Sequence, residues 1–333
     1  MRAAYIEKTG EPEVIQYGEL PKPVPGPGEV LVRVAAAAVN PIDTYIRSGM
    51  VSAKLPRPYI IGCDLAGTVE TVGEGVTGCE GGLRVWGSNQ GLMGRQGTFA
   101  EYAVVGQEWL YPIPDGVGEG RAAALALVGI TAHLGLFRCG TLRSGETVFV
   151  SGGTGGVGST VVQMAKAVDA KVITTTGSAE KQKIARELGA DLVLNYKTDD
   201  VGASIREFTG GTGVDVWYET SREPNFERTI PLMARRGRMI VMAGREAQPR
   251  FPVGPFYVND LSLHGFAMFN ANADEQRPCA EAINGWMASG RLQPLIGRTF
   301  ALSEAVAAHR LQQENTLEKK GTLIGKIVVK PIG

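Results

Sequence analysis

The stretch Ser-Gly-Gly-Thr-Gly-Gly-Val-Gly, residues 151–158, decides the fold of this chain. It follows a β-branched apolar run, Thr147–Val150, and precedes a helical pattern over Val157–Val168. Three glycines within it keep a Gly-x-x-Gly-x-x-Gly spacing: Gly152, Gly155 and Gly158. The tight turn needs permissive φ angles, a pyrophosphate must approach backbone N–H groups, and the helix must pack close to the strand. A glycine turn between a strand and a helix therefore predicts a dinucleotide site at the positive end of the helix dipole.

The alternative for these glycines is a surface turn without a ligand, because a chain with 45 glycines can show this spacing by chance. The segments that follow the turn favour the nucleotide site, because they alternate between strand and helix. The expected strands are Lys171–Thr175, Leu192–Asn195, Val214–Tyr218 and Arg238–Ala243, and the expected helices are Ala179–Leu188, Val201–Phe208 and Asn225–Ala234. This alternation predicts an α/β fold with a doubly wound parallel sheet, which binds cofactors at the carboxyl ends of its strands.

The end of the second strand indicates which cofactor binds. An NAD enzyme usually has Asp or Glu about 20 residues beyond the glycines, where it holds the ribose 2′-hydroxyl. Here residues 174–178 read Thr-Thr-Thr-Gly-Ser, and Lys181 follows. Small hydroxyls and a cation suit a 2′-phosphate, so the sequence predicts NADPH. Glu180 points in a different direction from its neighbour on a helix, and the alternative for Lys181 is a solvated helix residue.

Length and composition describe a globular protein of two domains. The 333 residues are 44% hydrophobic and 20% charged, with 34 basic and 34 acidic residues. This balance gives no global basic field to recruit nucleic acid or an anionic membrane. Met1–Gly10 lacks the apolar core of a signal peptide, and the apolar stretch Ala122–Phe137 contains a histidine and is short for a membrane span. We expect a cytoplasmic protein.

The cysteines and histidines do not form a metal-binding pattern. They are Cys63, Cys79, Cys139, Cys279, His133, His264 and His309. None falls in a zinc-knuckle or His-Glu-x-x-His spacing. We expect reduced, partly buried thiols and histidines in the core or on the surface.

The segments that flank the glycine turn have a different character. Short β-like runs separated by glycine and proline occupy Val30–Val39, Asp64–Val72, Arg84–Trp86 and Phe99–Val105. They predict a largely antiparallel domain of barrel type. Thr322–Lys330 is another expected strand, which returns to that domain. The expected organisation is therefore a first domain over 1–121, a cofactor domain over 122–268 and a return segment over 269–333.

Residues 40–49 read Asn-Pro-Ile-Asp-Thr-Tyr-Ile-Arg-Ser-Gly and resemble the signature of quinone oxidoreductases of the medium-chain dehydrogenase/reductase superfamily, which include zeta-crystallin. Further similar blocks are Ile61–Gly67, Val76–Trp86, the glycine turn, Leu194–Tyr196 and Gly321–Val329. The resemblance runs from about Met1 to Lys330. It implies a GroES-like, mostly β catalytic domain built around a Rossmann domain.

The chain departs from the zinc alcohol dehydrogenases of that superfamily. Those enzymes carry a Cys at or near the position of Asn40 and Gly-His-Glu where this chain has Gly62-Cys63-Asp64. Their third ligand, a Cys, should fall near 128–130, and their structural zinc lobe near 86–97; neither segment contains a cysteine here. Catalytic zinc needs three converging protein ligands, so we expect no zinc. Without a Lewis acid, a conjugated carbonyl accepts hydride more easily than a simple ketone.

The resemblance implies roles for three residues of the first domain. Tyr45 matches a tyrosine that lies beside the nicotinamide, where it positions substrate, hydrogen-bonds the developing oxyanion or relays a proton; the alternatives are packing or a bond to the cofactor alone. Asn40 and Asp43 shape the same pocket. Asp43 has the alternative of capping a short helix that begins there.

The resemblance also implies the residues that contact the cofactor. Thr131 reaches the nicotinamide, unless its hydroxyl serves only the start of a helix. The other expected contacts are Thr154, Gly155, Gly156 and Val157 on the pyrophosphate; Gly177, Ser178, Lys181 and Tyr196 around the 2′-phosphate and adenine; Met242, Ala243, Gly244 and Arg245 along the cofactor; and Phe266, Ala267 and Met268 near the nicotinamide amide. Arg245 has the alternative of a surface residue.

The expected function is an NADPH-dependent, metal-free reductase of the NADPH:quinone oxidoreductase type that acts on a quinone or an α,β-unsaturated carbonyl. One alternative is an enoyl-thioester reductase of the same superfamily, which would need an acyl channel and a basic CoA site. Another is a zeta-crystallin-like structural or RNA-binding protein, which the balanced charge disfavours. Leu261–Phe269 resembles the edge strand through which family dimers extend their sheets, so we expect a homodimer or a homotetramer.

Overall fold

The computed structural model describes residues 1–51 and 54–331, which divide into two compact units. The flanking unit consists of Met1–Leu127 and Pro294–Gly333, and the central unit consists of Val128–Gln293. Helix α2 (Glu119–His133) leads the chain from the first unit to the second. Residues 269–293 were predicted to belong to the return segment, but they cluster with the central unit and include α8 (Ala273–Ala288).

The central unit, whose residues are all described, is built on a six-stranded parallel sheet in the order β11-β10-β9-β12-β13-β14. Its strands are β9 (Thr147–Val150), β10 (Lys171–Thr176), β11 (Leu192–Asn195), β12 (Val214–Glu219), β13 (Met233–Val241) and β14 (Ser262–Gly265). The strand order reverses between β9 and β12. A cofactor site is expected at that reversal, outside the carboxyl ends of the strands.

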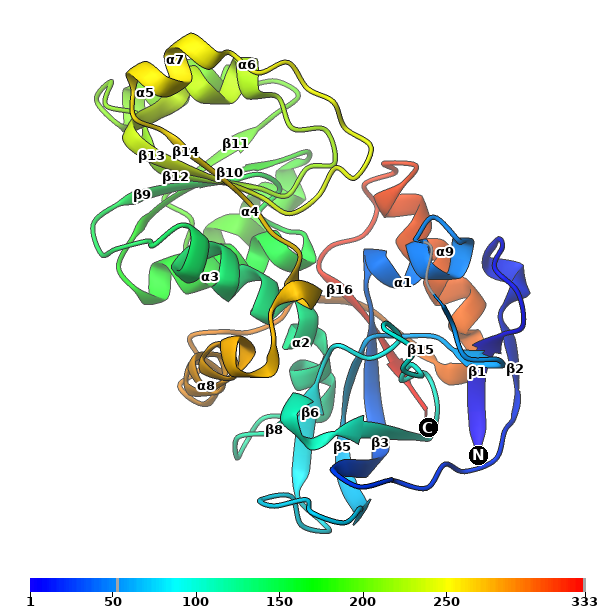
Figure 1. Ribbon diagram of the computed structural model, residues 1–333. Helices are drawn as coiled ribbons and strands as arrows, with labels where there is room; N and C mark the ends of the chain where they lie inside the picture. Colours follow the sequence, from blue (N-terminus) through cyan, green and yellow to red (C-terminus); the bar gives the residue numbers. More distant parts are fainter. Residues whose placement is uncertain (52–53, 332–333) are drawn as a thin grey trace. The chain divides into compact units, whose positions relative to one another are not determined.

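Helices cover both faces of this sheet (Figure 1). One face carries α3 (Gly156–Ala167) and α4 (Ala179–Glu187). The other carries α5 (Val201–Phe208), α6 (Phe226–Thr229) and α7 (Val253–Val258). The predicted doubly wound Rossmann architecture is confirmed. The inner strands β9, β10 and β12 are mostly buried, as expected of strands covered on both faces, whereas the edge strand β14 alternates between half-buried and exposed residues.

One predicted helix of the central unit is mostly wrong. Residues 225–234 form only the short α6, followed by a 3-10 turn over Ile230–Leu232, and β13 begins at Met233. Pro231 lies in that turn and lacks the N–H that a continuing helix would use. The strand predicted over 238–243 therefore begins earlier and ends at Val241.

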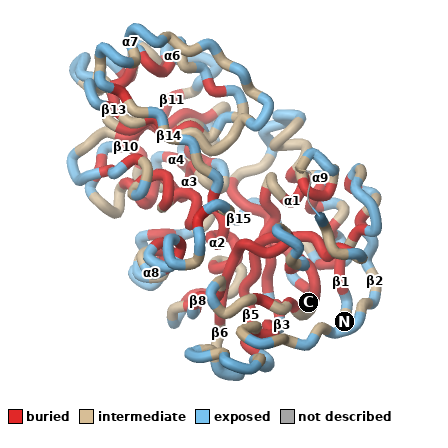
Figure 2. Tube along the Cα trace, viewed as in Figure 1, coloured by how far each residue is buried: buried red, intermediate tan, exposed pale blue. Residues whose placement is uncertain are grey.

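Hydrophobic side chains from both sheet faces fill the central unit. Phe149 and Trp217, on neighbouring strands, stack with their ring centroids 3.8 Å apart. Ile173, Ile205 and Met239 belong to the same buried cluster. Figure 2 shows buried segments in the interior of this unit and the loops around α6 and α7 as largely exposed.

The described part of the flanking unit contains two sheets. A seven-stranded sheet has the path β15-β16-β3-β5-β6-β8, with β7 paired to β3, and a three-stranded sheet has the order β2-β1-β4. The bounds are β1 (Arg2–Ile6), β2 (Gln16–Glu19), β3 (Glu29–Val39), β4 (Tyr59–Ile60), β5 (Asp64–Val72), β6 (Arg84–Gly87), β7 (Tyr102–Gly106), β8 (Leu110–Pro112), β15 (Ile296–Ala301) and β16 (Lys326–Lys330). Among the described pairs, β15 with β16 is the parallel exception. The predicted antiparallel character is confirmed.

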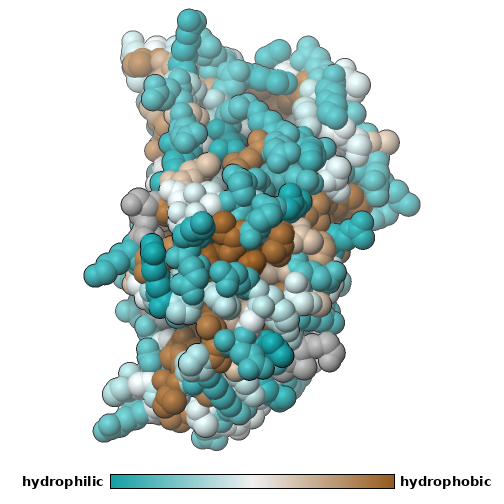
Figure 3. Space-filling view, turned by 90° about the vertical axis from the view of Figure 1, so that its right-hand side faces the viewer, coloured by the Kyte–Doolittle hydropathy of each residue, from teal (hydrophilic) through white to brown (hydrophobic). Residues whose placement is uncertain are grey.

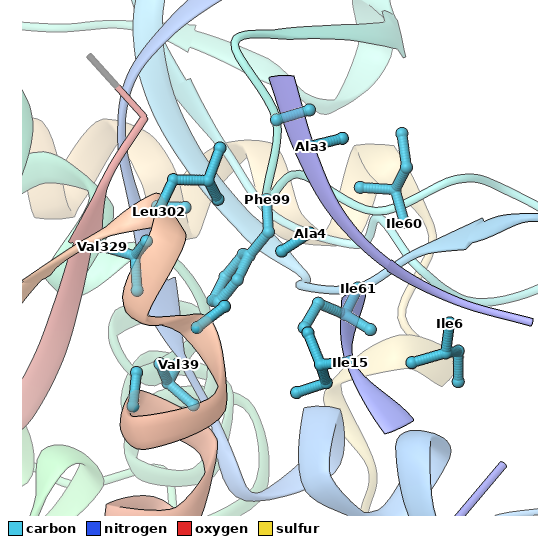
Figure 4. Packing of buried hydrophobic residues seen from close by; sticks show 14 of the residues in the cluster. Ala3, Ala4, Ile6, Ile15, Val39, Ile60, Ile61, Phe99, Leu302 and Val329 are labelled. Carbon is cyan, nitrogen blue, oxygen red and sulfur yellow. The ribbon is translucent and has the colours of Figure 1, made fainter. Parts of the chain in front are cut away.

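The chain's return to the flanking unit is also confirmed. β16 lies antiparallel beside β3, so residues almost 290 positions apart become neighbours. Helices α1 (Pro41–Ser48) and α9 (Ala305–Thr316) pack beside this sheet. Figure 4 shows part of this core, where Phe99, Val39 and Leu302 lie near side chains of β1 and β4 from the three-stranded sheet.

One face of the molecule is mainly hydrophilic (Figure 3), and the longest apolar helix is mostly buried. Figure 3 shows a face covered mainly by hydrophilic residues, with hydrophobic areas between them. Among the described residues, one helical stretch, Glu119–Cys139, has the length and composition that a membrane span would need. Its most apolar window is 78% buried inside the protein, as is usual for a core helix.

A buried histidine in the flanking unit predicts a pH dependence of stability. His309 on α9 is fully buried beside Phe99, at 5.6 Å between ring centroids, and neither ring nitrogen has a hydrogen-bond partner in the described structure. Burial lowers the pKa of His309 to about 3, and Arg47 adds to that effect. In the unfolded chain the imidazole titrates near pH 6.5.

Below that pH the unfolded chain therefore binds a proton that the folded chain does not, so stability falls as the pH drops toward 3. We expect His309→Leu to remove this loss. As the pH falls from 7 to 5, the free energy of unfolding of wild type should drop by about 2 kcal/mol more than that of the variant. This figure follows because one bound proton changes the free energy of unfolding by about 1.4 kcal/mol per pH unit. Urea denaturation at both pH values measures the difference, in which titrations common to both proteins cancel. Parallel pH slopes for the two proteins would contradict the expectation.

Candidate functional site

The glycine turn joins β9 to α3 in the central unit, and each motif glycine has its own structural reason. Gly152 has a φ of 68°, which favours glycine. A Cβ on Gly158 would lie 2.1 Å from the carbonyl oxygen of Gly152. A Cβ on Gly155 would meet only that same oxygen, at 3.5 Å. The fold therefore requires Gly152 and Gly158, whereas Gly155 leaves open space at the start of α3.

This open space lies where a helix offers N–H groups that have no partner within the helix. Gly155 is the N-cap of α3, and Gly156 and Val157 begin the helix. Thr154 is buried at the base of the turn. The predicted pyrophosphate contacts are thus brought together in one short segment that fits an anion.

Threonines of β10 hold this turn in place. The Thr174 hydroxyl donates to the carbonyl oxygen of Val150 at 2.7 Å, and the Thr175 hydroxyl accepts from Gly152 N–H at 3.3 Å. Thr174, Thr175 and Thr176 are all buried. The small hydroxyls of residues 174–178 were predicted to suit a phosphate, but the Thr174 hydroxyl bonds the last residue of β9 and the Thr175 hydroxyl bonds the first glycine of the turn.

The carboxyl end of β10 gathers the other predicted residues of the 2′-phosphate region. Ser178 is the N-cap of α4 and accepts from Lys181 N–H at 3.3 Å. The Tyr196 hydroxyl lies 2.6 Å from the point where a Cβ on Gly177 would be, so the tyrosine ring packs closely over this glycine. Burial lowers the pKa of Lys181, Glu180 raises it, and the nearby Lys197 lowers it.

Lys197 was not among the residues predicted from sequence. Its Nζ lies 5.9 Å from the centroid of the Tyr196 ring, and its charge acts on Lys181. Two lysines and an exposed tyrosine therefore surround the end of β10. The signal that could have found Lys197 is its place directly after the Leu-Asn-Tyr block, where β11 ends beside β10.

The loops after β13 and β14 carry the remaining predicted cofactor contacts. Met242, Ala243, Gly244 and Arg245 follow the end of β13, and Phe266, Ala267 and Met268 follow the end of β14. Phe266 N–H donates to Val241 O at 3.2 Å, so these two loops start side by side. Arg245 is exposed and Met268 is buried. Both loops lie at the carboxyl edge of the sheet, as does the glycine turn.

Thr131, on α2 within the central unit, has a buried hydroxyl that lacks a hydrogen-bond partner in the described structure. Its carbonyl oxygen accepts from the Tyr218 hydroxyl at 2.8 Å. Tyr218 on β12 fixes this position, and it also went unnoticed in the sequence. A buried hydroxyl without a partner costs free energy, so a ligand atom at this point would satisfy it.

In the flanking unit, Asn40, Asp43 and Tyr45 belong to one short helix and the residue before it. Asn40 is the N-cap of α1, and its N–H donates to Asp43 Oδ2 at 2.7 Å. Asp43 therefore caps the helix, the alternative that the sequence left open. Burial raises the pKa of Asp43 to about 7, although Cys63 and the Asn40 N–H lower it. Tyr45 is half-buried, two residues further along α1.

A buried polar cluster surrounds Asn40. The Asn40 amide donates to Asp64 Oδ2 at 2.7 Å, and its Oδ1 accepts from Lys326 Nζ. Lys326 Nζ also donates to Val39 O at 2.7 Å. Burial raises the pKa of the Cys63 thiol well above its usual value, and Asp43 and Asp64 raise it further. Lys326 was not among the sequence-based candidates.

Metal ligands were not expected, and the described residues bring no three His, Cys, Asp or Glu side chains together as a metal site. The four cysteines are free thiols. His133 is partly buried beside Phe137, and burial lowers its pKa to about 4.

A cavity of about 260 Å³ lies beside the C-terminal end of α1 in the flanking unit. Gly49 and Val51 line it, and Leu55 and Pro56 add apolar surface. Lys8 and Arg57 supply two cations, next to Glu7. The cavity therefore combines an apolar wall with charge of both signs.

Comparisons with known proteins agree with both units. Residues 26–115 match the family model described as an alcohol dehydrogenase GroES-like domain, and residues 156–284 match the one described as a zinc-binding dehydrogenase. Human quinone oxidoreductase is 32% identical over 333 residues, which cover 99% of this chain and 97% of that protein.

Two solved structures share the whole architecture. An NAD-dependent alcohol dehydrogenase has a TM-score of 0.90 at 32% identity and full coverage of both chains. Escherichia coli quinone oxidoreductase, solved in complex with NADPH, has a TM-score of 0.87 at 27% identity and covers 99% of this chain and 100% of its own. The first of these proteins is named as NAD-dependent, and the second was solved with NADPH.

Proposed function

Since the chain belongs to the quinone oxidoreductase family of the medium-chain dehydrogenase/reductase superfamily, we propose that it transfers hydride from NADPH to a quinone or an α,β-unsaturated carbonyl. The observation that carries the proposal is the carboxyl end of β10. It lacks a carboxylate at residues 174–178 and is surrounded by Ser178, Lys181, Tyr196 and Lys197. Two cations and a hydroxyl suit a 2′-phosphate, whereas a ribose 2′-hydroxyl would need an acceptor.

The central unit fits the whole dinucleotide. The open space at Gly155 allows a pyrophosphate to approach the N-terminus of α3. The buried hydroxyl of Thr131, which has no hydrogen-bond partner in the described structure, could bond a polar atom of the cofactor. When bound, NADPH supplies the hydride. The residues of this chain hold and orient the cofactor, and the loops after β13 and β14 line the same edge of the sheet.

The donor set in the flanking unit does not fit a catalytic zinc ion. Both ends of the Asn40 amide are engaged, the burial of Cys63 favours the thiol over the thiolate that zinc requires, and the Lys326 amine lies among the same groups. We therefore infer a substrate that needs no metal to polarise it. In a conjugated acceptor the hydride adds at carbon, the displaced electron pair moves to oxygen, and that oxygen then takes a proton.

We assign the contact with that oxygen to Tyr45, whose half-buried phenol can donate a hydrogen bond to developing negative charge. Asn40 and Asp43 are buried and bonded within the unit, so we assign them the task of holding α1.

The experiment that tests this function is a screen of NADPH oxidation against quinones, enones and enoyl-CoA thioesters, each with and without a chelator. We expect turnover with quinones or enones, and no loss on chelation. Turnover of enoyl-CoA alone would replace the proposal by the thioester alternative, and loss on chelation would show a required metal.

The cavity beside α1 favours a second candidate, a conjugated acceptor that carries an acidic group. Lys8 and Arg57 together outnumber the one carboxylate of Glu7 and would attract such a group, while Leu55 and Pro56 would contact its carbon skeleton. The same screen separates the candidates when it includes acid-bearing and neutral enones of equal size. A preference for the acid that weakens with rising salt would favour this second candidate.

We also propose that the chain forms a homodimer through the edge of the central sheet. Among the described strands, β14 pairs only with β13, so its other edge is open. Leu263 on β14 and Val253, Tyr257 and Val258 on the adjoining α7 are exposed, Tyr257 to 67%. An open edge with exposed apolar side chains favours pairing with a second copy.

We expect Leu263→Lys to convert the dimer to a monomer, because a charge on the paired edge opposes association. Size-exclusion chromatography with light scattering measures the mass of each species. Val24→Lys is the matched control, since Val24 is an exposed hydrophobic residue of the flanking unit. A dimer that persists in the Leu263 variant would place the interface elsewhere.

A further inference from the structure

The helix that carries Tyr45 has a buried cation at each end. At its C-terminal end Arg47 is fully buried, donates to Gly10 O at 2.7 Å and bonds Gln313 on α9. At its N-terminal end Lys326 is 4% exposed and donates to Val39 O and Asn40 Oδ1, the two residues that lead into α1. The helix is thus fixed to the rest of the flanking unit at both ends.

Sheet pairing places Lys326 there. β16 runs antiparallel to β3 in the register that opposes Ile327 to Val39, and this brings Lys326 to Asn40. The two residues are 286 positions apart in the chain. The contact therefore exists only in the folded unit.

Helix stability does not explain this lysine. A cation at the C-terminal end of a helix, such as Arg47, complements the helix dipole, whereas a cation at the N-terminal end opposes it. Burying Lys326 also removes it from water, a cost that the nearby carboxylates of Asp64 and Asp43 offset. A wholly apolar cluster in place of Lys326, Asp64 and Asp43 would serve folding about as well, so the presence of the charged group calls for another explanation.

Orientation of Asn40 supplies that explanation. Lys326 Nζ donates a hydrogen bond to the side-chain oxygen of Asn40, and the side-chain nitrogen of Asn40 donates one to Asp64. The Asn40 amide therefore has one favourable orientation. The same residue's N–H binds Asp43 in the first turn of α1. Lys326 therefore fixes the N-cap, the N-cap fixes the first turn, and Tyr45 follows five residues after Asn40.

We propose that Lys326 is a positioning residue, which holds Asn40 and the first turn of α1 and thereby sets the direction in which Tyr45 presents its hydroxyl. The inference rests on the reductase function proposed above. It adds a residue from the far end of the chain that acts through Asn40 without touching substrate.

The experiment combines a direct probe of Tyr45 with a kinetic cycle. The protein is labelled with 3-fluorotyrosine, and the ¹⁹F resonance of residue 45 is assigned with Tyr45→Phe. Lys326→Met removes the amine at similar length, and Lys326→Met/Asp64→Asn also removes the carboxylate that would otherwise stay buried and uncompensated. Lys330→Met is the matched control, because Lys330 is exposed on the same strand.

We expect both Lys326 variants to shift or broaden the Tyr45 resonance, and Lys330→Met to leave it unchanged. The double variant should lower kcat for the best acceptor about tenfold, with KM for NADPH unchanged. In the Tyr45→Phe background the same change should have no further effect, since residues that act through one another are non-additive.

An unshifted Tyr45 resonance in the folded double variant would overturn the proposal, as would a tenfold loss that persists without the tyrosine hydroxyl. If the wild-type protein reduces no quinone or enone, the proposed function fails. The fluorine resonance still tests the positioning role in that case, because it requires no turnover.

Discussion

Replacing both Lys181 and Lys197 by alanine is expected to lower kcat/KM for NADPH by about 100-fold and to leave kcat/KM for NADH nearly unchanged. A hydrogen bond to a charged group contributes about 1.5–3 kcal/mol, and about 1.4 kcal/mol corresponds to a factor of ten. Lys181 is partly buried and Lys197 is exposed, so Lys181→Ala alone should account for most of the loss. Initial rates with both cofactors at fixed acceptor concentration measure the ratio.

The control for this pair is Lys183→Ala. Lys183 lies on the same helix α4 but is exposed and pairs with Glu187. It should change neither rate. The preference of the wild-type protein for NADPH should also shrink as salt is added, because screening weakens exposed charge interactions. Equal losses with NADPH and NADH would mean that the two lysines do not contact the 2′-phosphate.

The second large effect is expected from Gly155→Ala, which should weaken NADPH binding by about 100-fold or more while leaving the fold intact. The new Cβ would lie no closer than 3.5 Å to the protein, and the backbone of residue 155 is extended, with a φ of −75°. The stability cost should therefore stay within about 1 kcal/mol. The methyl group would instead fill the space through which a pyrophosphate approaches the helix N-terminus.

Gly158→Ala is the informative contrast, because there the Cβ would overlap the Gly152 carbonyl at 2.1 Å. That clash involves backbone, so the turn itself must move, and we expect a loss of stability of about 3 kcal/mol or more. Urea denaturation without nucleotide measures stability, and calorimetric titration measures NADPH affinity. If Gly155→Ala binds NADPH as tightly as wild type, the pyrophosphate does not lie against this turn.

Much of the central unit could be predicted from sequence because its signals are local. β9, β11 and α5 have the predicted residue ranges, since each is a short periodic run bounded by turn residues. The exception is the segment 225–234, where apolar residues at helical spacing proved to be a short helix, a proline-containing turn and the start of β13. Tertiary pairing with β12 decided that outcome, and no local pattern reveals such pairing.

The candidate site shows the same division. The glycine turn and the group of Ser178, Lys181 and Tyr196 lie at strand ends, which a strand-and-helix alternation predicts. Lys197 and Tyr218 were not predicted, because each acts on a residue that is distant in sequence: Lys197 on Lys181 and Tyr218 on Thr131. The hydroxyls of Thr174 and Thr175 were assigned to a phosphate, whereas hydrogen bonds across the sheet direct them to the glycine turn.

By itself the sequence determined the doubly wound sheet and the glycine turn. It also showed that the end of the second strand of the central unit has no carboxylate and that the positions of the family's zinc ligands hold other residues. These follow from residue type and spacing along a chain of regular period. Only the tertiary structure decided that Asp43 caps α1, that Asn40 is held between Asp64 and Lys326, and that residues 269–293 group with the central unit. Those contacts depend on sheet register and on packing between distant segments, and their free energy is absent from any local stretch of the chain.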